Sequence, residues 1–221
     1  MARGDSADTG SAGFFRLEIR AIETISMLAK RRTGRPRFRG CIMALPHFKP
    51  MTEAEYEVWH RQQDDRYEYV DGQAQLKFAE WDGPRLMTGA TQAHTAIGFN
   101  VSLLLHQALK GKGCRVFPSD GKIVTAKGNH RFPDVAVDCG TYRPDGYELE
   151  APVVVFEVLS KSTHWIDTTR KLDDYKSVAS IKHIVFLAQD EARGQCWSRG
   201  ADWEVVYFEG RAAVVDLPAL G

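Results

Sequence analysis

The sequence predicts a single α/β domain with a central mixed β-sheet flanked by helices. Two observations carry this prediction. The valine run Val153 to Val155 is typical of a central strand that is buried on both faces. Apolar residues spaced three and four positions apart predict a long amphipathic helix over Thr91–Lys110. The 221 residues are enough for one domain with a substantial core, and no apolar run approaches the length of a membrane-spanning helix.

Local signals place the other elements of this domain. Thr52, with Glu55 three residues later, forms a capping box that opens a helix. Asp71-Gly72 is a hairpin turn between two short strands. Asp167 is expected to cap a helix that follows the central strand. The expected strands cover residues 66–70, 73–78, 114–117, 121–126, 133–138, 152–159, 183–189, 194–198 and 203–208. Their order with the helices predicts one mixed sheet with both faces covered.

Residues 1–42 differ in composition from the rest of the chain. They contain nine of the 29 Lys and Arg residues but four of the 29 Asp and Glu residues, which leaves a net charge of −5 on residues 43–221. Three interpretations compete: a basic arm that contacts nucleic acid, a targeting segment, or an extension before a native start at Met43. We favour the third, with a helix over Phe14–Lys30 in a basic, disordered or non-native extension. Residues 43–221 then form the functional domain.

The four cysteines are far apart, and none forms a Cys-x-x-Cys pair. This spacing argues against a zinc knuckle and against a disulfide scaffold, and it favours a reducing, cytoplasmic location. The mildly acidic body does not suit tight nonspecific binding of DNA, but it suits a site that gathers carboxylates around a divalent metal ion. The cysteines are Cys41, Cys114, Cys139 and Cys196.

Glu157 interrupts the valine-rich central strand, where an unpaired carboxylate is costly to bury. Asp134 begins the strand before it, directly after Pro133, so two carboxylates fall on consecutive expected strands. Oxygen ligands of this kind hold Mg²⁺, which stabilises charge on phosphoryl oxygens and lowers the pKa of an attacking water. The pair therefore predicts metal-dependent hydrolysis of a phosphodiester bond.

Five further residues are candidates for the same site. Lys171 and Tyr175 are four residues apart on the helix after the central strand, and hence lie on one face. Glu68 lies in the first strand and Asp120 begins a later one. Glu68 also fits a solvent-facing position, and Asp120 an Asx-turn. His94 lies beside the buried stripe of the long helix, where a core-edge histidine is the simpler interpretation and a site-lining role the alternative.

Seven segments of the chain, taken in order, resemble the Uma-two family of endonucleases in the PD-(D/E)XK nuclease superfamily. Each segment alone is weak, but the seven in order are specific, and they cover about residues 51–210. They are Met51–Tyr56, Arg66–Gly72, Gly89–His94, Val116–Asp120, Phe132–Val135, Val155–Ser160, and Ser162-Thr163 with Asp167, Lys171 and Tyr175.

The resemblance implies a restriction-endonuclease-like core, a Mg²⁺ cofactor for which Mn²⁺ substitutes, DNA as the partner, and a homodimer. It supports Asp134 and Glu157 as catalytic and metal-binding residues. It also supports Glu68 as a further catalytic residue and Asp120 as a further metal ligand. These implications agree with the reaction that the two carboxylates predict by themselves.

One position departs from the superfamily pattern. A lysine is expected two residues after the second acid, where this chain has Leu159. The Uma-two pattern carries the same substitution. An apolar side chain cannot stabilise charge at the reacting phosphate, so another lysine must do so. Lys171 is the first candidate and Lys161, in the loop after the strand, is the second.

The sequence thus predicts a cytoplasmic, Mg²⁺-dependent DNA endonuclease that does not enter a membrane. Two alternatives stay open. The first is a catalytically inactive nuclease fold that binds or interacts without turnover. The second is a nuclease that acts on RNA through the same residues.

Overall fold

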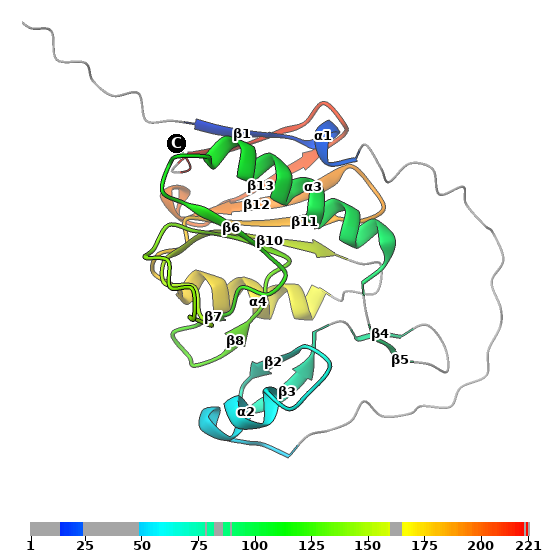
Figure 1. The fold of residues 1–221 in the computed structure, drawn as a ribbon. Helices are drawn as coiled ribbons and strands as arrows, with labels where there is room; N and C mark the ends of the chain where they lie inside the picture. The colour runs from blue at the N-terminus through cyan, green and yellow to red at the C-terminus, as the bar shows by residue number, and fades with distance from the viewer. Residues whose placement is uncertain are drawn as a thin grey trace, which may run out of the picture.

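The computed structural model describes residues 14–23, 49–77, 79–81, 86–88, 90–159, 165–218 and 220. A six-stranded sheet with the strand order β13-β12-β11-β10-β9-β6 lies at its centre (Figure 1). Strands β10 and β11 are parallel, and the other neighbouring pairs of this sheet are antiparallel. The predicted mixed central sheet is therefore confirmed, but the strands expected over residues 66–70, 73–78 and 121–126 form a separate sheet. The strands are β6 (Arg115–Pro118), β9 (Val135–Asp138), β10 (Pro152–Leu159), β11 (His183–Ala188), β12 (Arg193–Ser198) and β13 (Val205–Glu209).

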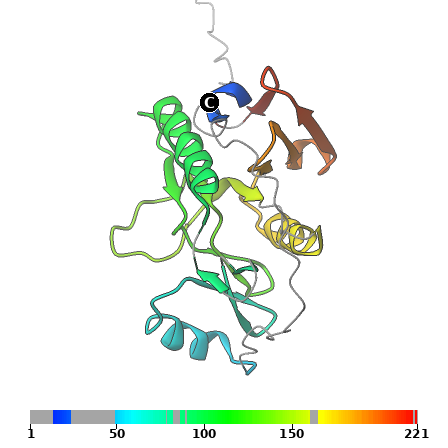
Figure 2. The ribbon, with the colours of Figure 1, turned by 90° about the vertical axis from the view of Figure 1, so that its right-hand side faces the viewer.

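Two helices cover opposite faces of this sheet, α3 (Gln92–Leu109) and α4 (Trp165–Ser177), and Figure 2 shows them on either side of β10. Alternation along the strands assigns the side chains to the two faces. Val135 and Phe156 pack in the core that α3 closes. Ala136 and Val155 pack in the core that contains Tyr175 of α4. Strand β10 is thus covered on both sides, as the valine run predicts.

A smaller sheet with the order β3-β2-β8-β7 lies below the central sheet in Figure 1. The helix α2 (Glu53–His60) packs on it through a cluster that includes Tyr56, Tyr69 and Ala74. The capping box of Thr52 and Glu55 opens this helix as predicted. The strands are β2 (Tyr67–Val70), β3 (Gln73–Leu76), β7 (Ile123–Val124) and β8 (His130–Arg131), and a separate hairpin contains β4 (Ala79–Trp81) and β5 (Leu86–Thr88).

Part of the N-terminal segment packs against the core. Residues 14–18 form β1 (Phe14–Glu18), which pairs with β14 (Val214–Pro218), and α1 (Ile19–Glu23) follows. The helix predicted from Phe14 is therefore wrong over residues 14–18. Leu17 and Ile22 are buried in the same core as α3, and that burial favours the observed strand pairing over an isolated helix. The remainder of residues 1–42 lies outside the described residues.

Three other expectations are corrected. Cys114 and Cys139 form a disulfide at the far end of the β6–β9 ladder, although the wide cysteine spacing argued against one. The strands bring the two residues together, which linear spacing does not reveal.

Asp167 lies inside α4, because this helix begins at Trp165. Strand β14 was not expected, although its alternating burial is a strand pattern. None of the described helices has the length and apolar character needed to span a membrane.

The packing of β1 generates a stability prediction. Leu17 is 1% exposed, so Leu17→Ala should lower the free energy of unfolding by about 2–4 kcal/mol, because it leaves a cavity in the core. Arg20→Ala is the control, since the Arg20 side chain is 71% exposed, and we expect a change within about 0.5 kcal/mol. Urea unfolding measures both. Removal of residues 1–42 should be destabilising for the same reason, and unchanged stability in Leu17→Ala and in the truncation would place this segment outside the domain.

Candidate active site

Strands β9 and β10 bring the two predicted carboxylates together. Their antiparallel register ends at the pair of Phe156 and Val135, so Glu157 lies in β10 one residue beyond this pair and Asp134 lies in the bend just before β9. Glu157 lies on the α4 face with Val155, because strand residues alternate between faces, and it contacts Tyr175 of α4. Asp134 contacts His94 of α3. The backbone N–H of Val158, the residue after Glu157, donates to the Asp134 carboxylate, so the two acids are near neighbours. The exposed fractions are 7% for Asp134 and 3% for Glu157, so the pair is buried at the end of the ladder.

Several donors surround Asp134. The backbone N–H of Val158 donates to Asp134 Oδ2 at 2.7 Å. His94 Nε2 lies 3.1 Å from Oδ2, and Lys77 Nζ lies 3.4 Å from Oδ1. Burial alone would raise the pKa of Asp134, but the hydrogen bond with His94 and the charges of Lys77 and Lys171 hold it below its usual range. Asp134 is therefore a stable carboxylate.

Glu157 has a different environment. Tyr175 donates its hydroxyl to Glu157 Oε1 at 2.5 Å, and Lys171 Nζ donates to Oε2 at 3.1 Å. Burial raises the pKa of Glu157. Lys171 opposes this change, but the nearby carboxylates of Asp134 and Glu68 add to it. Burial also raises the pKa of Tyr175 well above its usual value, which keeps the hydroxyl protonated as a donor.

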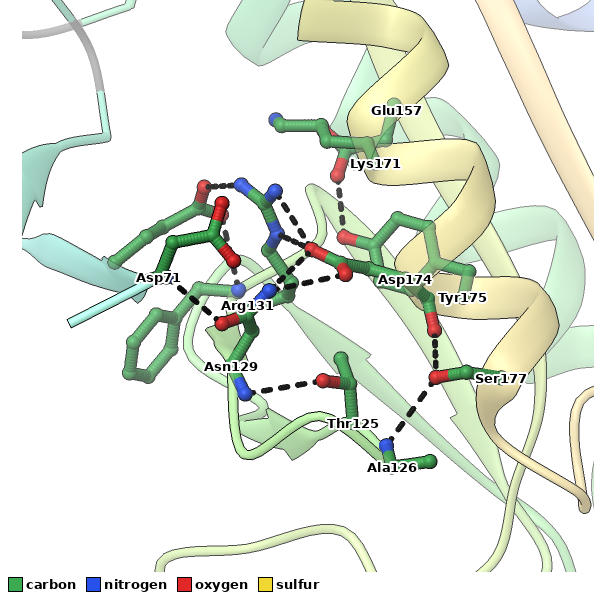
Figure 3. Close-up of polar contacts among 12 residues, drawn as sticks. Asp71, Thr125, Ala126, Asn129, Arg131, Glu157, Lys171, Asp174, Tyr175 and Ser177 are labelled. Carbon is green, nitrogen blue, oxygen red and sulfur yellow. Dashed lines mark hydrogen bonds and ion pairs between the residues drawn. The ribbon is translucent and has the colours of Figure 1, made fainter. Parts of the chain in front are cut away.

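A buried ion network adjoins the pair, and Figure 3 shows its members Arg131, Asp174 and Asn129. The network also contains Glu68. Arg131 is 1% exposed and donates from Nη1 to Glu68 Oε2 at 2.7 Å and from Nε to Asp174 Oδ2 at 2.8 Å. Asn129 Nδ2 donates to Asp174 Oδ1 at 3.0 Å, and the Phe132 N–H donates to Glu68 Oε1 at 3.2 Å. The network joins β2, β8 and α4, and thereby fixes the position of Glu68.

Glu68 is therefore not solvent-facing, since it is 4% exposed. Burial would raise its pKa, but the charges of Lys171 and Arg131 hold it below the usual value. Lys171 acts on the pKa values of Glu68, Asp134 and Glu157 alike. The charge of Lys171 on α4 thus stabilises the ionised form of all three acids.

Lys77 is the site residue that the sequence reading missed. Its side chain is 2% exposed, and Nζ donates to the Ser119 backbone oxygen at 3.2 Å as well as lying beside Asp134. A signal was present in the hairpin. The turn at Asp71-Gly72 pairs Glu68 with Gln75, so Lys77 is the diagonal neighbour of Glu68 on the same face. Arg131 and Asp174 had no such local signal.

The remaining candidates divide into three groups. His94, Lys171 and Tyr175 all reach the carboxylate pair. Asp120 does not: its side chain is 70% exposed and forms an ion pair with Arg66 at 2.6 Å. Its role as a metal ligand beside Glu157 stays a prediction, which this exposed pairing with Arg66 does not favour. Lys161 lies outside the described residues.

The donor set is compatible with Mg²⁺. Within the described ranges, no three His, Cys, Asp or Glu side chains are grouped closely enough to hold a metal ion by themselves. Mg²⁺ is usually held by one or two carboxylates, and water and substrate phosphates complete the shell. Asp134 and Glu157 meet that smaller requirement.

Comparison with known proteins reveals relatives of similar length. The chain is 26% identical over 166 residues to the uncharacterized protein slr1290 of Synechocystis sp., covering 73% of this chain and 82% of that protein. A second Synechocystis protein, the uncharacterized sll1609, is 24% identical over 182 residues, covering 80% of this chain and 97% of that one.

A solved structure shares the fold. It is the crystal structure of "a putative nuclease belonging to DUF820" from Anabaena variabilis, with a TM-score of 0.59 and 19% sequence identity. The alignment covers 77% of this chain and 91% of that chain. Residues 53–221 also match the Uma2 family, whose description reads "Putative restriction endonuclease". Because that match includes more than half of the sequence, the chain belongs to the Uma2 family.

Proposed function

We propose that this protein is a Mg²⁺-dependent endonuclease that hydrolyses phosphodiester bonds of DNA. One observation carries the proposal: Asp134, just before β9, accepts a hydrogen bond from the residue that follows Glu157 in β10, and Lys171 lies 3.1 Å from Glu157. Membership of the Uma2 family supports the same reaction class. DNA as substrate, a homodimer and a cytoplasmic location belong to this proposal.

Asp134 and Glu157 would hold the metal ion, or Mn²⁺ in its place. When bound, the ion supplies positive charge at the phosphoryl oxygens and lowers the pKa of water. The low pKa of Asp134 keeps one ligand ionised over a wide pH range. The raised pKa of Glu157 means that the second ligand must lose a proton at higher pH than an ordinary glutamate.

The chain's own cations divide the remaining work. Lys171 reaches Glu157 from α4, and its ammonium group is the one that would approach a phosphate at the acid pair. It therefore takes the role that Leu159 cannot perform. Tyr175 orients Glu157 through its hydroxyl, and Lys77 holds Asp134 from the other side. Glu68 acts by balancing the charge of Lys171 and Arg131.

A second candidate function is a nuclease fold that binds nucleic acid without cleaving it. One observation favours it: Lys171 and Tyr175 already occupy both oxygens of Glu157. A metal ion would have to share Oε2 with the lysine or displace it. An RNA nuclease would use the same groups and differ in substrate alone.

Plasmid nicking tests the proposal. Purified protein should nick supercoiled DNA with Mg²⁺ or Mn²⁺, and Asp134→Ala and Glu157→Ala should each abolish nicking because each removes one of two metal ligands. Metal should also raise the Tm of the wild type, since a ligand at 100 times its Kd stabilises by about 2.7 kcal/mol, and this rise should vanish in Asp134→Ala. Asp120→Ala is the matched control and should retain both properties.

Nicking that persists in both alanine variants would contradict the site. DNA binding without nicking under either metal, in a protein whose Tm does not respond to metal, would favour the second candidate. Cleavage of RNA but not DNA would change the substrate and leave the site unchanged.

The role of Lys171 can be measured separately. Lys171→Met should reduce the nicking rate by about 100-fold or more, because it removes the charge beside the reacting phosphate. Lys182→Met is the control, since Lys182 is exposed, and it should leave the rate unchanged. Lys77→Met should have a smaller effect on the rate. A larger loss in Lys77→Met than in Lys171→Met would reverse the roles of the two lysines.

The two carboxylates should contribute to stability with opposite signs. Glu157 has a raised pKa in the fold, so its stabilising effect is present while it is protonated and is lost as pH rises through the folded pKa. Glu157→Gln should therefore be more stable than wild type at neutral pH, with the difference opening above the ordinary pKa of 4.5. Each pH unit between the unfolded and folded pKa adds about 1.4 kcal/mol.

Asp134 has a lowered pKa, so its contribution is present above the ordinary value of 3.8 and is lost as pH falls through the folded pKa. Asp134→Asn should thus be less stable than wild type at neutral pH, and the difference should shrink in acid. Urea unfolding of both variants between pH 3 and 8 checks the pair. Changes of the same sign in both variants would refute this electrostatic assignment.

A further inference from the structure

A hollow of about 470 Å³ runs along α3 and ends at Asp134. One wall consists of α3 residues four positions apart, including His94, Gly98 and Ser102, which lie on one side of the helix. The opposite wall includes Val116 of β6. From His94 to the far end of this helix face the wall extends for about 18 Å, at 1.5 Å per residue. The hollow therefore starts at the catalytic carboxylate and leads away from it.

The wall of this hollow presents an aromatic face. Phe99 is 63% exposed and Leu103 is 44% exposed, and both line the hollow. A Cβ atom added at Gly98 would meet nothing within 4 Å, so the space above this part of the helix is open. A volume of this size suits a ligand as large as a nucleoside.

The lining of the hollow carries little charge, which suits an uncharged base, and no Lys or Arg is among its described residues. Among the described residues that line it, Asp134 is the one acid. The neighbouring hollow is strongly charged instead, because its lining combines four acids with three basic side chains, Arg61, Arg66 and Lys122. The cations Lys77 and Lys171 lie at the Asp134 end of the first hollow, where a phosphate would be cut.

We propose that the α3 hollow binds the unstacked base of a nucleotide next to the scissile phosphate. The base lies against Phe99, and its phosphate lies toward Asp134. The bases of an intact duplex are stacked on one another and cannot enter, so the substrate is single-stranded or locally unpaired nucleic acid. This proposal rests on the proposed nuclease function and specifies its substrate. A second copy of the chain is a poorer occupant, because it would cover the carboxylate that the reaction needs.

Binding to the non-cleaving Glu157→Gln variant tests this proposal without relying on turnover. The probes are a fluorescein-labelled 12-nucleotide single-stranded DNA, the same sequence as a blunt duplex, and a single strand containing 2-aminopurine. The single strand should bind more tightly than the duplex, and the 2-aminopurine fluorescence should change on binding. Adding Phe99→Ala should weaken single-strand binding by about 5- to 100-fold, as expected for loss of one stacked base.

Gly98→Trp, which fills the hollow, should weaken single-strand binding by a similar factor. The matched controls are Tyr207→Ala, at an aromatic residue that is 69% exposed on β13, and Gly200→Trp, at a glycine whose added Cβ meets nothing within 4 Å. Both controls should bind like the parent variant. Thermal unfolding verifies that each variant is folded, and Phe99→Ala decides the outcome if Gly98→Trp does not fold.

Equal affinity in Phe99→Ala and Tyr207→Ala would overturn the proposal, as would duplex binding as tight as single-strand binding with unchanged 2-aminopurine fluorescence. Dissociation of a dimer by Phe99→Ala at unchanged strand affinity, seen by sedimentation, would also overturn it and assign the hollow to contacts between copies. A further outcome is the expected binding pattern together with a wild-type protein that cleaves no nucleic acid. That result would refute the nuclease function, but it would still support the hollow as a binding site for a single strand.

Discussion

The burial of three carboxylates in one place is the constraint on which the rest of the structure depends. Glu68, Asp134 and Glu157 are each less than one tenth exposed, and isolated charges at such positions are prohibitively costly. The fold compensates by bringing cations from several elements to the same point. Lys171 comes from α4, and Arg131 comes from β8. The arrangement of β9 against β10 and of α4 on their face therefore serves electrostatic balance as well as apolar packing.

Arg131 also connects the smaller sheet to α4. It links Glu68, on the smaller sheet, to Asp174 on the helix that covers the central sheet. Removing one partner from a buried ion pair usually costs about 3–5 kcal/mol, because the other charge is left uncompensated. The position of the small sheet is thus tied to the position of α4, and the site is assembled where these two parts meet. A local change at Asp174 would be felt at Glu68 through this one guanidinium group.

The sequence was sufficient for the elements with strong local signals. The buried strand at residues 152–159, the capping box at Thr52 and the hairpin turn at Asp71-Gly72 were all predicted, since neighbouring residues determine them. Glu157 could be singled out because a charge in an apolar strand is itself a signal, while its role together with Asp134 stays a prediction. Contacts between residues distant in sequence had no such signal. The strand β1, the Cys114–Cys139 disulfide and the pairing of Asp120 with Arg66 all depend on the three-dimensional arrangement, and they were predicted wrongly or not at all.

The disulfide lies at one end of the β6–β9 ladder and Asp134 lies just beyond the other, where Pro118 pairs with Val135. A crosslink across 25 residues restricts the unfolded chain by about 3–4 kcal/mol in the loop-entropy account. Its effect on the folded chain is confined to the end of the ladder that is remote from the reacting groups. The disulfide and the acid pair therefore lie at opposite ends of the same two strands. In a reducing compartment the disulfide would be reduced, and the protein would unfold and be proteolysed sooner. The chemistry of each molecule that stays folded would not change.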